Sequence, residues 1–326
     1  MKLIEKKITI IIPSRKIDKN LKFCVKKIRK FYNKIKIILI LDYINKSFFF
    51  DKNIQIIKSS KKTIGAKRNL GVRKSKTKYI CFIDSDAYPI SPWLKNTEKA
   101  FNYADNIGAV GGPNLSPSSK NLEERLVASI KKNGLFTLNK ELKIKSQSIE
   151  FVNFLHSCNF IIKKTTYNRL NGMFENIYSG EEVSLNYKLL KSGYKLLSYP
   201  TIIVNHKDRN FKNFMKQRFI YGSTGLKLFI KYPCITTLKL LLSSVPVLFL
   251  FLFPIFFFCQ QIKNITLFFF IIFIFAIIAN TIKIYEKGSF FKSLKLVIIS
   301  IISPGIGLLL SFFLSNNKFQ KLYTQN

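Results

Sequence analysis

Short apolar runs alternate with helical patterns along the first two-thirds of the chain. Residues 8–12 predict a buried strand that ends at Pro13, and residues 20–32 carry apolar side chains at helical spacing. The alternation continues with strand-like segments at 35–41, 53–58 and 79–83 and a helical segment at 65–75. Alternating strands and helices favour parallel β-α-β units, in which ligands bind beyond the carboxyl ends of the strands. The sequence therefore predicts an α/β domain with a cleft near Pro13, Asp42 and Asp84.

The middle of the chain gives weaker signals. Ser91 followed by Pro92 predicts the start of a helix, and the Gly-Gly-Pro sequence at 111–113 predicts a turn. Residues 116–148 are polar and weakly patterned, which is typical of a mobile or acceptor-facing segment. Further on, the pattern predicts a strand at 159–162 and helices at 165–172 and 180–191.

Three apolar spans dominate the end of the chain, at residues 240–259, 265–282 and 294–314. Each has about 20 residues, which at about 1.5 Å per residue matches a hydrocarbon core of about 30 Å. A buried core helix is the alternative, but these neighbouring spans have almost no polar face. Pro246 and Pro254 are compatible with a membrane helix. We therefore expect an α/β domain at residues 1–232 and an all-α membrane anchor with three transmembrane helices at residues 233–326.

Lysines near the spans predict their orientation. Several precede the first span and several flank the loop after the second, whereas residues 260–264 contain only Lys263. The tail contributes Lys318 and Lys321. The positive-inside rule then predicts a multi-pass protein of the cell membrane with its α/β domain in the cytoplasm and its C-terminus outside.

The formal net charge of +37 first suggests a nucleic-acid partner. The charge is nearly all lysine, however, and it is scattered, whereas base reading relies on clustered arginine. We therefore expect no nucleic-acid partner. Codon bias and attraction to an anionic membrane leaflet, where each lysine contributes about 1 kcal/mol, both explain the excess. The five cysteines include no C-x-x-C pair, which argues against a disulfide framework or a zinc site.

Two carboxylates follow the strand predicted at 79–83. Asp84 and Asp86 are two residues apart, so they can share a hard divalent cation and a sugar hydroxyl. Such a cation neutralises a diphosphate and stabilises its departure. The same spacing also occurs in an ordinary turn after a strand, so the pair alone does not establish a metal site.

Several motifs in a fixed order give the pair a context. They are Ile-Ile-Ile-Pro-Ser-Arg at 10–15, Asp42 after a strand, Gly-Ala-Lys-Arg-Asn-Leu-Gly at 65–71, Phe-Ile-Asp-Ser-Asp at 82–86, Gly-Gly-Pro-Asn at 111–114, Ser-Cys-Asn-Phe at 157–160, Gly-Met-Phe at 172–174 and Gly-Glu-Glu-Val-Ser-Leu at 180–185. Over residues 8–222 this set resembles the family 2 glycosyltransferases of the GT-A fold. Each motif is loose, but their order and spacing make the set specific.

The resemblance implies how a nucleotide-sugar donor would bind. It implies that Pro13, Ser14, Arg15 and Asp42 hold the base of the nucleotide. Lys67 and Arg68 would lie near the nucleotide, where Arg68 can fork onto phosphate oxygens, and Asn69 would steady the loop. Asp84 would contact the ribose and Asp86 the metal, Mn²⁺ or Mg²⁺. An exposed helix face is the alternative for Lys67 and Arg68 in so lysine-rich a chain.

The resemblance also implies a base that deprotonates the acceptor. Glu182 is the first choice, but the family usually has Glu-Asp where this chain has Glu181 and Glu182, so either carboxylate is a candidate. A pair of acids that only complements the helix dipole is the alternative. His206 is a candidate second metal ligand or diphosphate contact, and a structural histidine is equally compatible.

The expected function is inverting, metal-dependent transfer of a sugar from a UDP-, GDP- or dTDP-linked donor to a hydroxyl of a lipid-linked or envelope glycan acceptor, as in polysaccharide biosynthesis. Gln217, Arg218 and Phe219 lack the spacing and the Trp of processive family members, which favours single additions. A nucleotidyltransferase on a similar sheet is one alternative, although its Gly-rich phosphate loop is missing after the first strand. An inactive membrane scaffold is the other.

Overall fold

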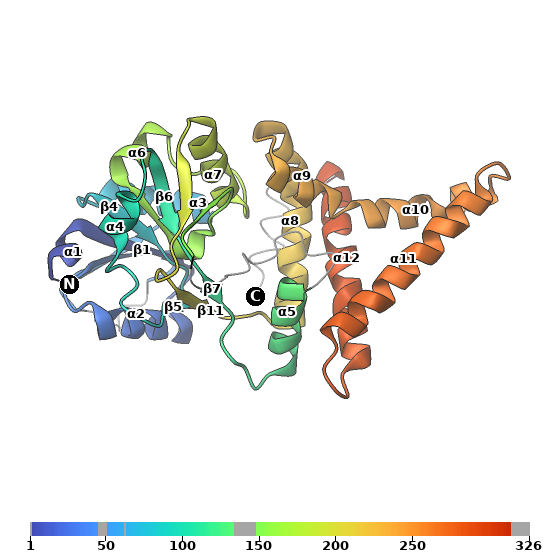
Figure 1. Cartoon of the computed structure of the whole chain (residues 1–326), viewed down its shortest axis with the longest axis horizontal. Helices are drawn as coiled ribbons and strands as arrows, with labels where there is room; N and C mark the ends of the chain where they lie inside the picture. The colour runs from blue at the N-terminus through green and yellow to red at the C-terminus, as the bar shows by residue number, and fades with distance from the viewer. Residues whose placement is uncertain (1, 45–50, 62, 134–147, 314–326) are drawn as a thin grey trace. The chain divides into compact units, whose positions relative to one another are not determined.

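The computed structural model describes residues 2–44, 51–61, 63–133 and 148–313 and divides the chain into two compact units (Figure 1). The first unit comprises residues 1–117 and 144–207, and the second comprises residues 118–143 and 208–326. The predicted boundary at residue 232 therefore lies inside the second unit, because the helix before it packs on helices after it. The division into a catalytic domain at residues 1–232 and a membrane anchor at residues 233–326 stays a prediction.

The first unit is an α/β domain, as the alternating pattern predicted. Its strands are β1 (Ile8–Ser14), β2 (Lys36–Leu41), β3 (Ile54–Lys58), β4 (Tyr79–Phe82), β5 (Ala87–Pro89), β6 (Ile107–Gly111), β7 (Asn114–Leu115), β8 (Glu150–Val152), β9 (Phe160–Lys163), β10 (Lys195–Ser198) and β11 (Val204–His206). Its helices are α1 (Lys2–Lys7), α2 (Lys19–Phe31), α3 (Ile64–Lys74), α4 (Thr97–Phe101), α6 (Lys164–Arg169) and α7 (Glu181–Lys191), with a short 3₁₀ turn, η1 (Ser157–Asn159).

Eight strands form the main sheet in the order β3-β2-β1-β4-β9-β6-β10-β8, and β5-β11-β7 form a small second sheet. β1 pairs in parallel with β2 and β4, so their carboxyl ends meet at one edge. β9 runs antiparallel between β4 and β6, a mixed topology that the alternation did not predict. The parallel strands carry near-continuous apolar runs because both faces of the sheet are covered.

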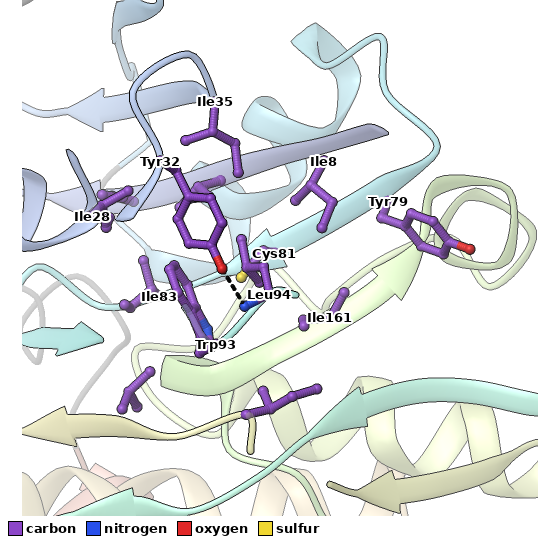
Figure 2. Packing of buried hydrophobic residues seen from close by; sticks show 14 of the residues in the cluster. Ile8, Ile28, Tyr32, Ile35, Tyr79, Cys81, Ile83, Trp93, Leu94 and Ile161 are labelled. Atoms are coloured by element: carbon purple, nitrogen blue, oxygen red, sulfur yellow. Dashed lines mark hydrogen bonds between the residues drawn. The ribbon is translucent and has the colours of Figure 1, made fainter. Parts of the chain in front are cut away.

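The core of this unit joins α2 to the strands. Tyr32, just after α2, lies edge-on to Trp93 at 5.6 Å between ring centroids (Figure 2). Its hydroxyl accepts a hydrogen bond from the backbone N–H of Leu94 at 2.8 Å. The helix predicted to start at Ser91 is wrong for this reason: residues around Trp93 form turns that bury the indole, and α4 starts at Thr97.

The second unit contains only helices among its described residues. They are α5 (Leu122–Asn133), α8 (Phe211–Lys231), α9 (Ile235–Leu242), α10 (Val245–Phe258), α11 (Lys263–Ile284) and α12 (Phe290–Phe313). Residues 116–148 were predicted to be mobile or to face the acceptor. The first alternative is wrong for α5, because Leu122, Leu126 and Ile130 recur every four residues and face an apolar cluster, and the second stays a prediction. Residues 134–147 of that stretch lie outside the described residues.

Three helical segments are long and apolar enough to cross a membrane: Ile235–Phe258, Lys263–Ile284 and Phe290–Phe313. They confirm the three predicted apolar spans by length and composition, with Leu314 outside the described residues. All five cysteines are unpaired, as their spacing predicted.

Candidate functional site

The ends of β1 and β2 gather the residues predicted for the donor base. The backbone N–H of Asp42 donates to the carbonyl of Arg15 at 3.0 Å, which fastens the two strand ends together. Nζ of Lys67, from α3, donates to the carbonyl of Ser14 and pairs with Oδ1 of Asp42, both at 2.9 Å. Burial lowers the pKa of Lys67, and its bond to Asp42 opposes that shift. Lys67 is only 2% exposed, so the alternative of an exposed helix face is wrong.

The buried side chain of Arg68 bridges two carboxylates, one after β4 and one at the start of α7. Its Nη2 donates to Oδ1 of Asp84 at 2.6 Å, and its Nη1 bonds Oε1 of Glu181. Burial alone would lower the pKa of this guanidinium, but the two carboxylates raise it. Because Arg68 is 1% exposed and its terminal nitrogens face protein carboxylates, it is placed to hold Asp84 and Glu181 rather than to fork onto a phosphate.

Asn69 fastens α3 to the loop that leads to α7. Its Nδ2 donates to the carbonyl of Met173 and to Oε1 of Glu175, each at 2.9 Å, and its Oδ1 accepts from the N–H of Met173 and the hydroxyl of Tyr167. Asn69 therefore holds the loop at 173–175 against α3, and its role in donor binding stays a prediction. Tyr167 and Glu175 were not identified from the sequence, since neither belongs to a motif and both meet Asn69 only through folding.

Glu181 and Glu182 begin α7 but have different surroundings. Gly180 has a φ of 85°, a left-handed conformation that glycine adopts without strain, and it turns the chain into the helix. Glu181 is 3% exposed and bound to Arg68, whereas Glu182 is half-buried. Burial, and then the charge of Glu181, raise the pKa of Glu182 from 4.5 to about 8, against the lowering effect of Arg68. The carboxylate free of the Arg68 pair is therefore Glu182.

Asp84, Asp86 and His206 form a cluster that fits a divalent cation. One ligand atom from each lies within 4.8 Å of the others. The small sheet creates this proximity: β5 begins directly after Asp86 and pairs antiparallel with β11, so that His206 lies opposite Ala87. Nε2 of His206 is 3.2 Å from Oδ1 of Asp86. Two carboxylates are ligands that suit Mn²⁺ or Mg²⁺, and an imidazole is a common ligand of transition-metal ions.

The imidazole is held between two groups of this site. Burial alone would lower the pKa of His206, but Asp86 and the Cys158 thiol beside it raise it above the usual value. The raised pKa favours the protonated imidazole. A metal ion binds the neutral ring, so metal binding would release the extra proton. Cys158, 4% exposed, was not identified from the sequence as a neighbour of the metal ligands.

Comparisons with known proteins show what this chain is similar to. Residues 9–167 match the family model "Glycosyl transferase family 2". A curated relative, "Pre-mycofactocin glycosyltransferase" of Mycobacterium tuberculosis, is 22% identical over 169 residues, which are 52% of this chain and 35% of the relative. The chain thus matches about a third of that protein's length.

A solved structure shares the fold. "Mannosyltransferase PcManGT from Pyrobaculum calidifontis in complex with GDP-Man and Mn2+" superposes with a TM-score of 0.57 at 12% identity, over 93% of this chain and 87% of that one. The likeness confirms the predicted GT-A-like α/β domain followed by C-terminal helices.

Proposed function

We propose that this chain, whose residues 9–167 form a glycosyl transferase family 2 domain, is a membrane-attached, metal-dependent glycosyltransferase. It transfers a sugar from a nucleotide-sugar donor to a hydroxyl of an acceptor. One observation carries the proposal: the Asp84–Asp86–His206 cluster and Glu182 are joined through Arg68 and Glu181. A cation site and a base are the two groups that such a transfer requires.

Asp84, Asp86 and His206 would hold Mn²⁺ or Mg²⁺. When bound, the ion neutralises the diphosphate as it leaves. Asp42, Lys67 and the loop at 13–15 bind the base end of the nucleotide, because they lie together at the ends of β1 and β2. Asp84 also reaches the ribose.

Glu182 is the proposed general base. The acceptor oxygen attacks the anomeric carbon, the bond from that carbon to the phosphate oxygen breaks, and the hydroxyl proton passes to Glu182. Attack from the face opposite the leaving group inverts the anomeric centre. Glu181 is unsuited to this role, because its carboxylate is buried against Arg68 and neutralised by it.

Arg68 is a positioning residue in this scheme. It touches neither donor nor acceptor but holds Asp84 on the donor side and Glu181 next to the base. Its buried charge therefore fixes the distance between the donor site and the base.

The apolar helices of the second unit attach the enzyme to the cell membrane, and the lysine distribution supports a cytoplasmic catalytic domain. A membrane enzyme that uses soluble donors suits a lipid-linked or envelope glycan acceptor.

The test is a screen of donors with the full chain solubilised in detergent. The protein is incubated with UDP-, GDP- and dTDP-sugars in Mn²⁺ or Mg²⁺, and release of the nucleoside diphosphate is measured. GDP-mannose is among the donors because the mannosyltransferase of similar fold binds it. Release from at least one donor that stops in EDTA supports the proposal. If no donor releases its nucleoside diphosphate, the result points to an inactive scaffold. If pyrophosphate is released from a nucleoside triphosphate and a sugar phosphate instead, it points to a nucleotidyltransferase.

A further inference from the structure

The third apolar helix, α12, packs along α8 within the second unit. The two helices run side by side in Figure 1, and α12 is 50% buried, against 17% for each of the other two candidate spans. Contacts follow the same order along both helices from Arg218–Ser300 to Gly222–Pro304, and Gly307 lies against Phe219 and Ser223, one turn apart on α8. The helices therefore run in the same direction, and the paired stretches of α8 and α12 must lie at the same depth relative to a membrane.

A proline in α12 creates the acceptor that Arg218 fills. Pro304 has no backbone N–H, so the carbonyl of Ser300, four residues earlier, lacks its helical donor. Nη2 and Nε of Arg218 donate to that carbonyl at 3.2 and 3.4 Å. The arginine is 7% exposed, and burial lowers its pKa to about 10, which leaves it charged at neutral pH.

Glycines bring the two backbones into direct contact. A Cβ on Gly222 would lie 1.8 Å from the carbonyl oxygen of Pro304, and one on Gly307 would lie 2.0 Å from that of Phe219. At these two glycines the helices therefore pack backbone against backbone, with no room for a side chain or a lipid chain between them. The position of α8 therefore decides the position of α12.

α8 is too charged to cross a bilayer. Its 21 residues include Lys212, Lys216, Arg218, Lys227 and Lys231 and no acid. Its longest uncharged stretch, residues 219–226, covers only about 12 Å at about 1.5 Å per residue, against a hydrocarbon core of about 30 Å. Each lysine or arginine at the centre of a membrane helix costs about 2.5–3.5 kcal/mol. α8 therefore lies outside the hydrocarbon.

We propose that α8 and α12 lie together along the membrane surface and that only Ile235–Phe258 and Lys263–Ile284 cross the bilayer. The exposed positions of the pair combine lysines with apolar side chains such as Ile298 and Phe312, which suits the boundary between anionic headgroups and acyl chains. Two crossings return the chain to its starting side. Lys318 and Lys321 of the tail then share a side with the other lysine-rich segments, in better agreement with the positive-inside rule than three crossings. None of this depends on the proposed sugar transfer.

The first experiment locates the C-terminus of the full chain in sealed membrane vesicles. Single reporter cysteines are native Cys259 after α10, Lys212→Cys on α8, Lys287→Cys between α11 and α12, and a cysteine appended after Asn326, in a background without Cys234 and, for the last three, without Cys259. An impermeant maleimide labels them before and after the vesicles are opened. The proposal requires the appended cysteine to react together with Lys212→Cys and Lys287→Cys and opposite to Cys259. The proposal is overturned if the appended cysteine is labelled from the same side of the membrane as Cys259. It is also overturned if Cys259 is labelled from the same side as Lys212→Cys.

The second experiment measures depth. Ile298 and Ile306 on α12, 39% and 41% exposed, are replaced by labelled cysteines, and Ile274 on α11, 40% exposed, is the matched control. Lipid-borne quenchers at shallow and deep positions are then compared. A surface helix gives shallow and equal quenching at Ile298 and Ile306, with deep quenching only at Ile274. A crossing helix would separate the first two labels in depth by up to about 12 Å, which would overturn the proposal.

Discussion

Asp84 and Asp86 have different neighbours although one residue separates them. Oδ1 of Asp84 is bound by Arg68 at 2.6 Å, whereas Oδ1 of Asp86 lies 3.2 Å from Nε2 of His206. Because Arg68 already binds one oxygen of Asp84, Asp86 is the ligand on which we test the cation site.

Asp86→Ala is expected to abolish donor turnover because it removes a charged metal ligand. Circular dichroism should remain unchanged, since Asp86 lies in the turn between β4 and β5 and is only half-buried. EDTA should inhibit the parent enzyme, and Mn²⁺ or Mg²⁺ should restore it. Asp105→Ala, an exposed acid before β6, is the matched control and should keep full activity. Full turnover in excess chelator would contradict the metal assignment.

Glu182→Gln is expected to slow transfer by about 10²- to 10⁴-fold, the usual effect of losing a general base, with little change in nucleotide affinity. Glu181→Gln should act differently, because it leaves the buried Arg68 with one carboxylate fewer and so lowers thermal stability as well. Transfer rate, nucleotide affinity and melting temperature separate the two. If Glu181→Gln alone were inactive at unchanged stability, the roles would be reversed.

The pKa of Glu182 predicts a rising pH profile. Because burial and Glu181 raise that pKa to about 8, the carboxyl is mostly protonated at pH 6 and cannot accept a proton. kcat/KM should therefore rise by about tenfold per pH unit below pH 8 and level off above it. Glu182→Gln should flatten the profile, and an unchanged slope in that variant would exclude Glu182 as the titrating base.

At the scale of elements, α3 holds the site together. Seven of its 11 residues are buried, and three of these are polar: Lys67, Arg68 and Asn69. Each connects a different part of the first unit, namely the ends of β1 and β2, the carboxylates of Asp84 and Glu181, and the loop at 172–175. Gly65 lets this helix approach that loop, since a Cβ there would lie 2.5 Å from the carbonyl oxygen of Phe174.

The pairing of α8 and α12 predicts an energetic coupling between Arg218 and Pro304. Arg218→Leu should lower the melting temperature in detergent, because the Ser300 carbonyl is left without a donor. In a Pro304→Ala background the restored backbone N–H of residue 304 donates to the Ser300 carbonyl. Arg218→Leu should then leave that carbonyl with a donor and lower the melting temperature less. Lys212→Ala, exposed on the same helix, is the control. Equal shifts in both backgrounds would show that the two residues are independent.

At the scale of the whole molecule, the second unit draws on two separate stretches of sequence. α5 comes from between β7 and β8, yet Leu126 and Val127 share an apolar cluster with Phe214 of α8 and Leu296 of α12. Nζ of Lys131 also pairs with Asp208, which precedes α8, at 2.8 Å.

A chain truncated after Tyr232 is therefore expected to need detergent. It keeps α5 and α8 but loses α12, so the apolar cluster becomes exposed to water. Sedimentation without detergent, in low and high salt, measures this. A monodisperse protein in salt alone would instead support the boundary at residue 232 that hydropathy predicts.

Motif order gave the positions of most site residues but not their surroundings. Asp84 and Asp86 follow a predicted strand, and strand ends are where ligands bind in such sheets. The sequence offered no signal that Arg68 is buried, because α3 has no clear apolar side and lies among many exposed lysines. Polar residues at buried positions are decided by the partners they meet.

By itself, the sequence determined the elements whose cause is local. Apolar period and length fix β1, β2, α2 and the three apolar helices, since burying or spanning depends on residues close together in the chain. Tertiary structure alone decided the contacts between distant residues: His206 beside Asp86 through the pairing of β5 with β11, Arg68 between Asp84 and Glu181, and α8 along α12. Hydropathy shows that α12 is apolar enough to cross a membrane, but only the packing shows that the charged helix α8 lies against it.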